Sequence, residues 1–89
     1  MPVLLVTVGE VTGVTYLDSC MYVVCAGCNT VWSYRAETYE LLEQELKVVG
    51  MTDPTDIVTC RVDRQLYIAD ADKLQGAPCI WRIGAQFVA

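Results

Sequence analysis

The chain contains no histidine and few basic residues: six Lys and Arg stand against eleven Asp and Glu, for a formal net charge of −5. Without histidine, Ser-His-Asp and Cys-His catalytic groups cannot form, and the commonest ligand of transition metals is missing. Without a basic cluster, nucleic acid is a poor candidate partner, because binding phosphates requires concentrated cations. We therefore expect a protein that is not an enzyme and that binds neither a cofactor nor nucleic acid.

The sequence also lacks a long apolar run. No stretch approaches the roughly 20 apolar residues of a membrane-spanning helix, and the N-terminal MPVLLVTV is too short for a signal peptide and has no basic start. Five cysteines cannot all pair within one chain, so we expect free thiols and a reducing compartment or recombinant expression. Yet 54% of the residues are hydrophobic, more than one small domain buries alone. We expect another protein chain, not a membrane, to cover this surface.

What is present is a series of short runs rich in Val, Ile, Tyr and Trp, separated by polar or Gly- and Pro-containing turns. Such runs predict antiparallel strands. The two central runs, MYVVCA and LYIADA, do not alternate apolar and polar residues, which is typical of strands buried on both faces. The expected strands are 14–17, 20–26, 30–35, 57–60, 65–70 and 79–83, with a further β-rich run at 1–9.

Segment 36–49 gives conflicting signals. Its helix formers and the helical spacing of its apolar residues would suit a short amphipathic helix. We interpret it instead as a turn followed by a strand, because LKVVGM at 46–51 matches LVTVGE at 5–10. The side chains then expected on one side of that strand are Leu42, Leu46 and Val48.

The predicted strands form two copies of one pattern. The copies lie 41 to 49 residues apart, and the differences fall in the turns. Four strands in about 40 to 45 residues are typical of a β-propeller blade. The matched landmarks are Gly9 with Gly50, Gly13-Val14 with Asp56-Ile57, Tyr22-Val23 with Tyr67-Ile68, and Val31-Trp32 with Ile80-Trp81.

The pattern GMTDPTDIVTCRVDRQLYIADAD, followed by CIWRI, resembles a blade of NHL-type β-propellers. In that family a blade reads Gly, a loop, Pro-x-Gly/Asp-Ile, then Tyr-Val/Ile-Ala-Asp and an Arg- or Trp-bearing strand. Residues 50–84 match this pattern, and residues 9–50 match it more loosely, with Cys25 where the second copy has Asp70. The resemblance implies an all-β platform that binds proteins or small ligands. Propeller rings hold about four to eight blades, so two blades suit an excised or engineered fragment.

The order of the strands predicts how two blades close a ring. Residues 10–50 hold a full first blade, residues 51–89 hold a second blade without its outer strand, and residues 1–9 hold a spare outer strand. We expect this spare strand to complete the second blade of the next chain in a head-to-tail ring. A homotrimer with six blades is favoured, and a homotetramer with eight is the alternative. The expected interface residues are Val3, Leu4, Leu5, Val6, Val8, Ile80, Trp81 and Ile83.

A few side chains are candidates for chemistry. Asp53 and Asp56 precede the innermost strand of the second blade, so a ring would place these carboxylates at its pore mouth, able to hold waters or a cation. The alternative to the propeller is a small α+β domain with a helix at 37–49 and Cys25-Ala-Gly-Cys28 as a redox or metal site. The weak candidates for metal ligands are Cys25, Cys28, Asp70 and Asp72.

Two aromatic residue types recur at matching positions of the two copies. Trp32 matches Trp81, and Tyr22 matches Tyr67. Exposed aromatic side chains can bind sugars or peptides, but repetition at the same strand position indicates a repeated packing role. We expect these four side chains to pack between blades.

Overall fold

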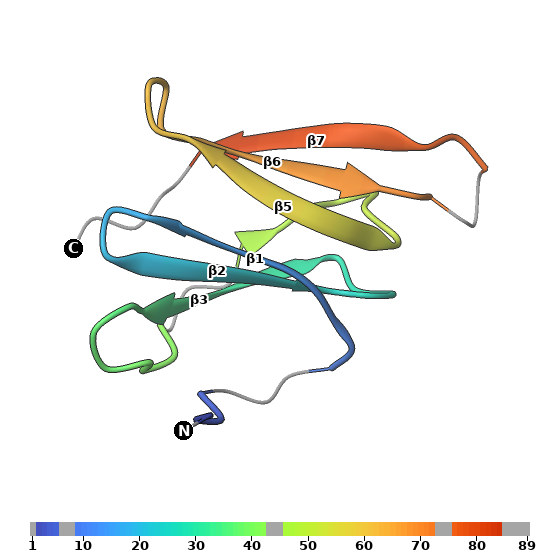
Figure 1. Ribbon diagram of the computed structural model, residues 1–89. Coiled ribbons are helices and arrows are strands. Elements are labelled where there is room, and N and C mark those ends of the chain that lie inside the picture. The colour runs from blue at the N-terminus through green and yellow to red at the C-terminus, as the bar shows by residue number, and fades with distance from the viewer. Residues whose placement is uncertain (1, 6–8, 43–45, 73–75, 85–89) are drawn as a thin grey trace.

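The chain folds into two antiparallel β-sheets that lie one above the other (Figure 1). This computed structural model describes residues 2–5, 9–42, 46–72 and 76–84. The first sheet has the strand order β1-β2-β3-β4, and the second has the order β5-β6-β7. The strands are β1 (Val11–Leu17), β2 (Cys20–Cys25), β3 (Thr30–Arg35), β4 (Leu46–Lys47), β5 (Pro54–Cys60), β6 (Gln65–Asp70) and β7 (Cys79–Gly84).

The all-β prediction is confirmed, and the helix of the α+β alternative is wrong over its described residues, 37–42 and 46–49. In this segment β4 pairs with β3, and Leu46 lies opposite Val31. Burial of one side of the segment overrides its helical propensity, which is a weak preference. As predicted, Leu42, Leu46 and Val48 pack into one apolar cluster. Among the described residues, no helix is long and apolar enough to cross a membrane.

Strands β1 and β5, the first strand of each sheet, both begin three residues earlier than predicted. Each extension contains a register shift at the same place: between Val11 and Gly13 in β1, and between Pro54 and Asp56 in β5. The extra residue of such a bulge lets pairing continue past a position that breaks the alternation of a regular strand. Sequence patterns alone do not reveal this continuation.

The ladder registers of the two sheets are equivalent. Val14 lies opposite Val23, which lies opposite Trp32; in the second sheet Ile57, Ile68 and Trp81 form the same row. These rows agree with three of the four matched landmarks in the sequence. Both sheets therefore arrange their first three strands in the same way.

The fourth landmark, Gly9 with Gly50, is wrong by two residues. The amide of Ala26 donates to the carbonyl of Glu10 (2.8 Å), and the amide of Ala71 donates to the carbonyl of Asp53 (3.0 Å), so Glu10 matches Asp53 and Gly9 matches Thr52. Gly50 is required for a different reason, its backbone conformation and its closeness to Trp81. Its φ is 98°, and a Cβ placed on it would lie 3.0 Å from the indole ring of Trp81, which favours glycine.

The main core lies between the two sheets. The inner face of the first sheet carries Tyr22, Val24 and Val31, and the inner face of the second carries Ile57, Leu66 and Ile68, all buried. Trp81 and Ile83 pack against this cluster from β7. The outer face of the first sheet holds a second cluster, in which Met21, Val23, Cys25 and Tyr34 are buried and Cys28 and Trp32 are partly buried.

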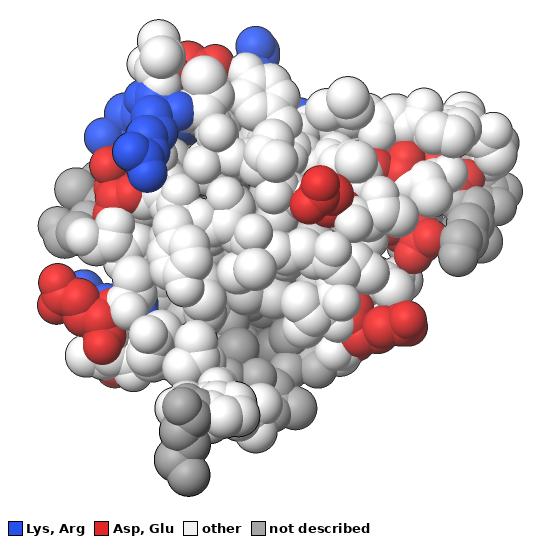
Figure 2. All heavy atoms as spheres, in the orientation of Figure 1, with Lys and Arg blue, Asp and Glu red and all other residues white. Residues whose placement is uncertain are grey.

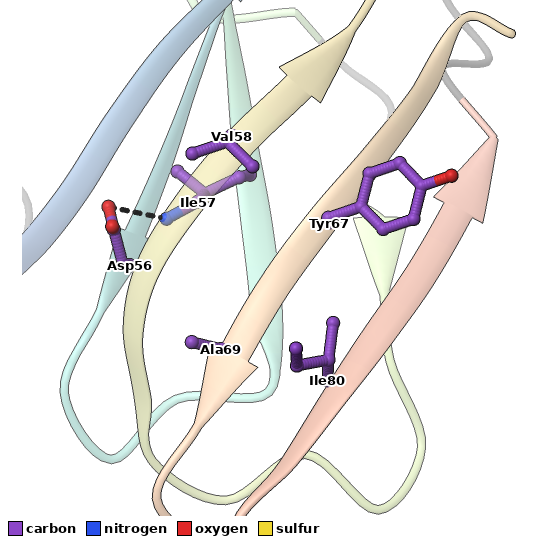
Figure 3. Close-up of a pocket in the computed structure, with 6 residues that line it drawn as sticks. All are labelled: Asp56, Ile57, Val58, Tyr67, Ala69 and Ile80. Atoms are coloured by element: carbon purple, nitrogen blue, oxygen red, sulfur yellow. Dashed lines mark hydrogen bonds between the residues drawn. The ribbon is translucent and has the colours of Figure 1, made fainter.

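Strand β2 is therefore buried along its whole length, as its apolar run predicts. Strand β6 differs, because its residues alternate between buried and half-buried. The prediction of burial on both faces is thus confirmed for β2. For β6, one face is buried and the other is half-buried. The half-buried positions, such as Tyr67 and Ala69, lie on the outer face of the second sheet (Figure 3).

Strands β1 and β5 lie side by side where the two sheets meet. A Cβ on Gly13 would come within 2.9 Å of the Ile57 amide nitrogen and 3.0 Å of the Asp56 Cα, so the contact excludes any larger side chain at Gly13. Threonine hydroxyls connect the strands: Thr12 donates to the carbonyl of Pro54 (2.7 Å), and Thr59 donates to that of Tyr16 (3.1 Å). These bonds fix one sheet relative to the other.

Candidate functional site

Strand β7 has an open edge. It pairs with β6 on one side, and among the described residues no strand pairs with its other side. In the first sheet, the equivalent strand β3 carries β4 on that side. An open edge presents a row of backbone donors and acceptors that can pair with another chain. Ile80, near the start of β7, is 72% exposed.

The N-terminal segment presents exposed apolar side chains. Residues 2–5 belong to no strand. Val3 is 74% and Leu4 is 83% exposed, and Leu5 is also exposed. Three consecutive apolar side chains in water are costly, at about 25 cal/mol for each Å² that burial would remove from water. The predicted interface residues Val6 and Val8 lie outside the described residues.

The outer face of the second sheet adds a shallow apolar surface beside the open edge (Figure 3). Val58 lies opposite Tyr67, and Ala69 lies opposite Ile80. With Asp56, these residues line a cavity of about 100 Å³. Val58 is 53% exposed. Sequence reasoning missed Val58 and Ala69 as surface residues, although the strand period of two places them on the face opposite Ile57 and Ile68.

Charged side chains occupy only part of the face that Figure 2 shows. In the view of Figure 2, uncharged side chains cover most of the visible face, and Lys and Arg gather near the hairpin that joins β5 to β6. The turn of that hairpin contains Arg61 and Arg64, and Arg64 pairs with Asp18 at 2.7 Å. The visible face therefore offers no broad charged surface to oppose contact with a second apolar surface.

The buried carboxylate of Asp70 holds the site in place. It accepts hydrogen bonds from the amides of Thr52 (3.2 Å), Asp53 (2.9 Å) and Asp72 (2.8 Å) and from the indole Nε1 of Trp81 (2.9 Å). Burial alone would raise the pKa of the Asp70 carboxyl, but these four donors outweigh burial and lower it. Asp70 thereby connects the end of β6 to the entry of β5 and to β7.

The predicted interface residues on β7 fall on both of its faces. Trp81 and Ile83 face the core between the sheets, whereas Ile80 faces outward (Figure 3). Trp81 is further fixed by its hydrogen bond to Asp70. Of these three side chains, Ile80 is the most exposed to solvent. An added strand would pair with the backbone of β7.

The two predicted pore-mouth acids have different surroundings. Asp53 is buried, and its carboxylate accepts the amide of Gly27 (3.1 Å), which connects it to the β2–β3 loop. Asp56 is exposed, and its carboxylate accepts the amide of the next residue, Ile57 (2.8 Å; Figure 3). The single chain thus leaves Asp56 as the candidate for a ring of carboxylates, and that ring stays a prediction about an assembly.

The weak metal candidates do not form a ligand set in the part of the chain that the structure describes, where no three His, Cys, Asp or Glu side chains group together. The oxygens of Asp70 face N–H donors, whose positive ends disfavour a cation. Asp72 accepts the hydroxyl of Thr52 (3.1 Å). Burial, followed by the neighbouring Cys28, raises the pKa of the Cys25 thiol, which disfavours the thiolate that metal binding and redox chemistry require.

No model of a known protein family matches the chain, and no curated protein matches it in sequence. Its function is therefore inferred from the geometry of the chain itself. The geometry offers an open strand edge, an exposed apolar segment and an exposed apolar sheet face.

Proposed function

We propose that this chain is a non-enzymatic, self-assembling protein whose N-terminal segment adds as a strand to β7 of the next copy. The observation that carries the proposal is the difference between the two sheets: β3 has β4 beside it, whereas the equivalent edge of β7 is open among the described residues. Strand addition satisfies the backbone groups of an open edge and adds contacts between side chains on neighbouring strands. The exposed side chains of Val3, Leu4 and Leu5 would supply those contacts.

The first sheet suggests the register of the added strand. Leu46 lies opposite Val31. The counterpart of Val31 is Ile80. With the two-residue correction at Gly9, Val3 is the counterpart of Leu46 and Leu5 is the counterpart of Val48. In this arrangement Val3 of one copy lies opposite Ile80 of another.

Such a contact joins two different surfaces, so it repeats from copy to copy until it closes. Each copy contributes two blades, and six-bladed trimers or eight-bladed tetramers lie within the range of about four to eight blades known for propellers. The ring is proposed to act as a platform of the NHL propeller type, with hairpin turns and the Asp56 carboxylates at its openings, and without a cofactor.

Two proline substitutions test strand addition as a matched pair. In the first sheet, the amides of Val48 and Leu42 donate to carbonyls of the β3 segment (2.8 Å each), so even-numbered residues there direct N–H groups at β3. Their counterparts in the N-terminal segment are odd-numbered, so Leu5 would direct its N–H at β7 and Leu4 would direct its N–H away. Proline lacks this donor and is tolerated only where the N–H faces solvent.

We therefore expect Leu5→Pro to convert the assembly to single chains and Leu4→Pro to leave it intact, as measured by light scattering coupled to size-exclusion chromatography. Deleting residues 2–8 should also abolish the closed assembly, and because the whole segment is removed it should leave open chains that aggregate. If the two proline variants have the same mass, the segment does not pair as a strand, and strand addition is wrong.

A further inference from the structure

Within the chain, the inner face of the first sheet packs against the inner face of the second. The strand pairing gives each residue of this contact a defined position in its sheet. On the first sheet, the contact uses the inner residues Tyr22, Val24 and Val31. On the second sheet, it uses the inner row Ile57 and Ile68, completed by Trp81. Because the two sheets share one register, every position in this contact has a counterpart in the other sheet.

The counterparts of the first side lie on the outer face of the second sheet. Tyr22 corresponds to Tyr67, and Val31 corresponds to Ile80. Tyr67 is half-buried and Ile80 is exposed, and both line the shallow cavity shown in Figure 3. The second sheet therefore repeats, on its outer face, the surface that the first sheet presents to it.

The counterparts of the second side lie on the outer face of the first sheet. Ile57 corresponds to Val14, and Trp81 corresponds to Trp32. Val14 is 51% exposed and Trp32 is partly buried. Tyr16, on the same face, is also exposed. The repeated aromatic pairs are thus divided, with Tyr22 and Trp81 inside the contact and Tyr67 and Trp32 on the two outer faces.

We infer that the outer face of the second sheet docks on the outer face of the first sheet of a second copy. The occupant is a second copy because the chain itself carries both halves of the contact, one on each outer face. The inference rests on the proposed self-assembly and names the surfaces that meet, in addition to the added strand. Val58, Tyr67 and Ile80 of one copy face Val14, Tyr16 and Trp32 of the next.

The close approach between β1 and β5 is specific to the contact within the chain. There, Gly13 of the first sheet lies against the backbone of Asp56 and Ile57 in the second. In the contact between copies Asp56 takes the position of Gly13, and its Cβ requires β5 of one copy and β1 of the next to lie further apart. Met21, Val23 and Tyr34 are already buried in the single chain, so the newly covered residues are the exposed ones, Val14 and Tyr16.

Two valines on equivalent strands test the docking. Val14 on β1 is 51% exposed and Val58 on β5 is 53% exposed, so glutamate at either position reaches water and leaves the fold intact, which circular dichroism and a thermal melt check. A head-to-tail contact is blocked by either change, because each variant loses one of the two faces. We expect Val14→Glu and Val58→Glu to be single chains of 9.9 kDa when each is measured alone.

Mixing the two variants gives the decisive result. Val58→Glu keeps the outer face of its first sheet intact, and Val14→Glu keeps the outer face of its second sheet intact. These two faces can dock, whereas the altered face of each variant cannot take a further copy. We expect a 1:1 heterodimer at twice the single-chain mass. Val62→Glu, at a hairpin residue that is 96% exposed, should leave the wild-type assembly unchanged.

The docking is wrong if the mixture contains only single chains, or if either valine variant keeps the wild-type mass. The result for Leu5→Pro separates this failure from that of strand addition, since that variant alters neither face. Loss of assembly in Leu5→Pro together with full assembly of both valine variants would retain strand addition and overturn the docking. Single-chain behaviour of the wild-type protein would overturn both.

Discussion

Replacing Asp70 by asparagine is expected to lower the free energy of unfolding by about 3 kcal/mol, because hydrogen bonds to a buried charged group contribute roughly 1.5–3 kcal/mol each and several are altered together. The carboxylate accepts four N–H donors, and one is the Trp81 indole. Asparagine offers one acceptor oxygen and turns an NH₂ group towards donors that then lack a partner. Urea denaturation at one fixed protein concentration measures the change, since assembly contributes to apparent stability.

The matched control is Asp63→Asn. The carboxylate of Asp63 accepts hydrogen bonds from the hydroxyl of Tyr67 (2.8 Å) and the amide of Gln65 (3.2 Å), and both bonds are exposed to water. Removing the carboxylate should therefore change the free energy of unfolding only slightly. The pH dependence gives a second check. Because the pKa of Asp70 is lowered in the folded state, its contribution is present above the unfolded pKa of about 3.9 and is lost as pH falls through the folded pKa. Equal stability of the two variants would contradict the role given to Asp70.

Adding one methyl group at Gly13 is expected to lower the free energy of unfolding by about 2–3 kcal/mol. The new Cβ would lie 2.9 Å from the Ile57 amide nitrogen and 3.0 Å from the Asp56 Cα, and backbone atoms cannot rotate away as a flexible side chain can. Relief requires β1 and β5 to separate, which would also strain the threonine hydrogen bonds between them. Urea denaturation of Gly13→Ala measures the loss.

Gly9→Ala is the control for this effect. A Cβ at Gly9 meets one atom, the Cβ of Cys25, at 3.9 Å, which is an ordinary contact. We expect this variant to remain within about 0.5 kcal/mol of the wild type, the usual range for changes away from packed sites. If Gly13→Ala were equally harmless, the two sheets would not be packed as closely at this point as the structure indicates.

Local patterns were sufficient to locate the strands. Turn signals between runs of β-branched residues located the first three strands of each sheet. The tight turn at Asp18-Ser19 has both residues at positive φ (49° and 66°), as a type I′ hairpin turn requires. The limits of β1 and β5 were missed because a bulge depends on the partner strand. Segment 46–48 required the repeat, since its own composition favours a helix.

The division of side chains between inside and outside was not available from local patterns. Tyr22 and Tyr67 occupy the same ladder position, yet Tyr22 is buried and Tyr67 is half-buried. The reason is that the first sheet has the second packed on that face, whereas the second sheet has no further sheet of its own chain there among the described residues. Local patterns likewise mark Asp70 only as a weak candidate for a metal ligand, because the three amides around it come together only when β5 and β6 pair.

The molar mass of the intact chain in solution, measured by multi-angle light scattering across a range of concentrations, tests self-assembly most directly. Closed-ring assembly predicts a single species of three chains, or of four, with a mass that does not grow as concentration rises. A chain that stays at 9.9 kDa at every concentration would contradict it.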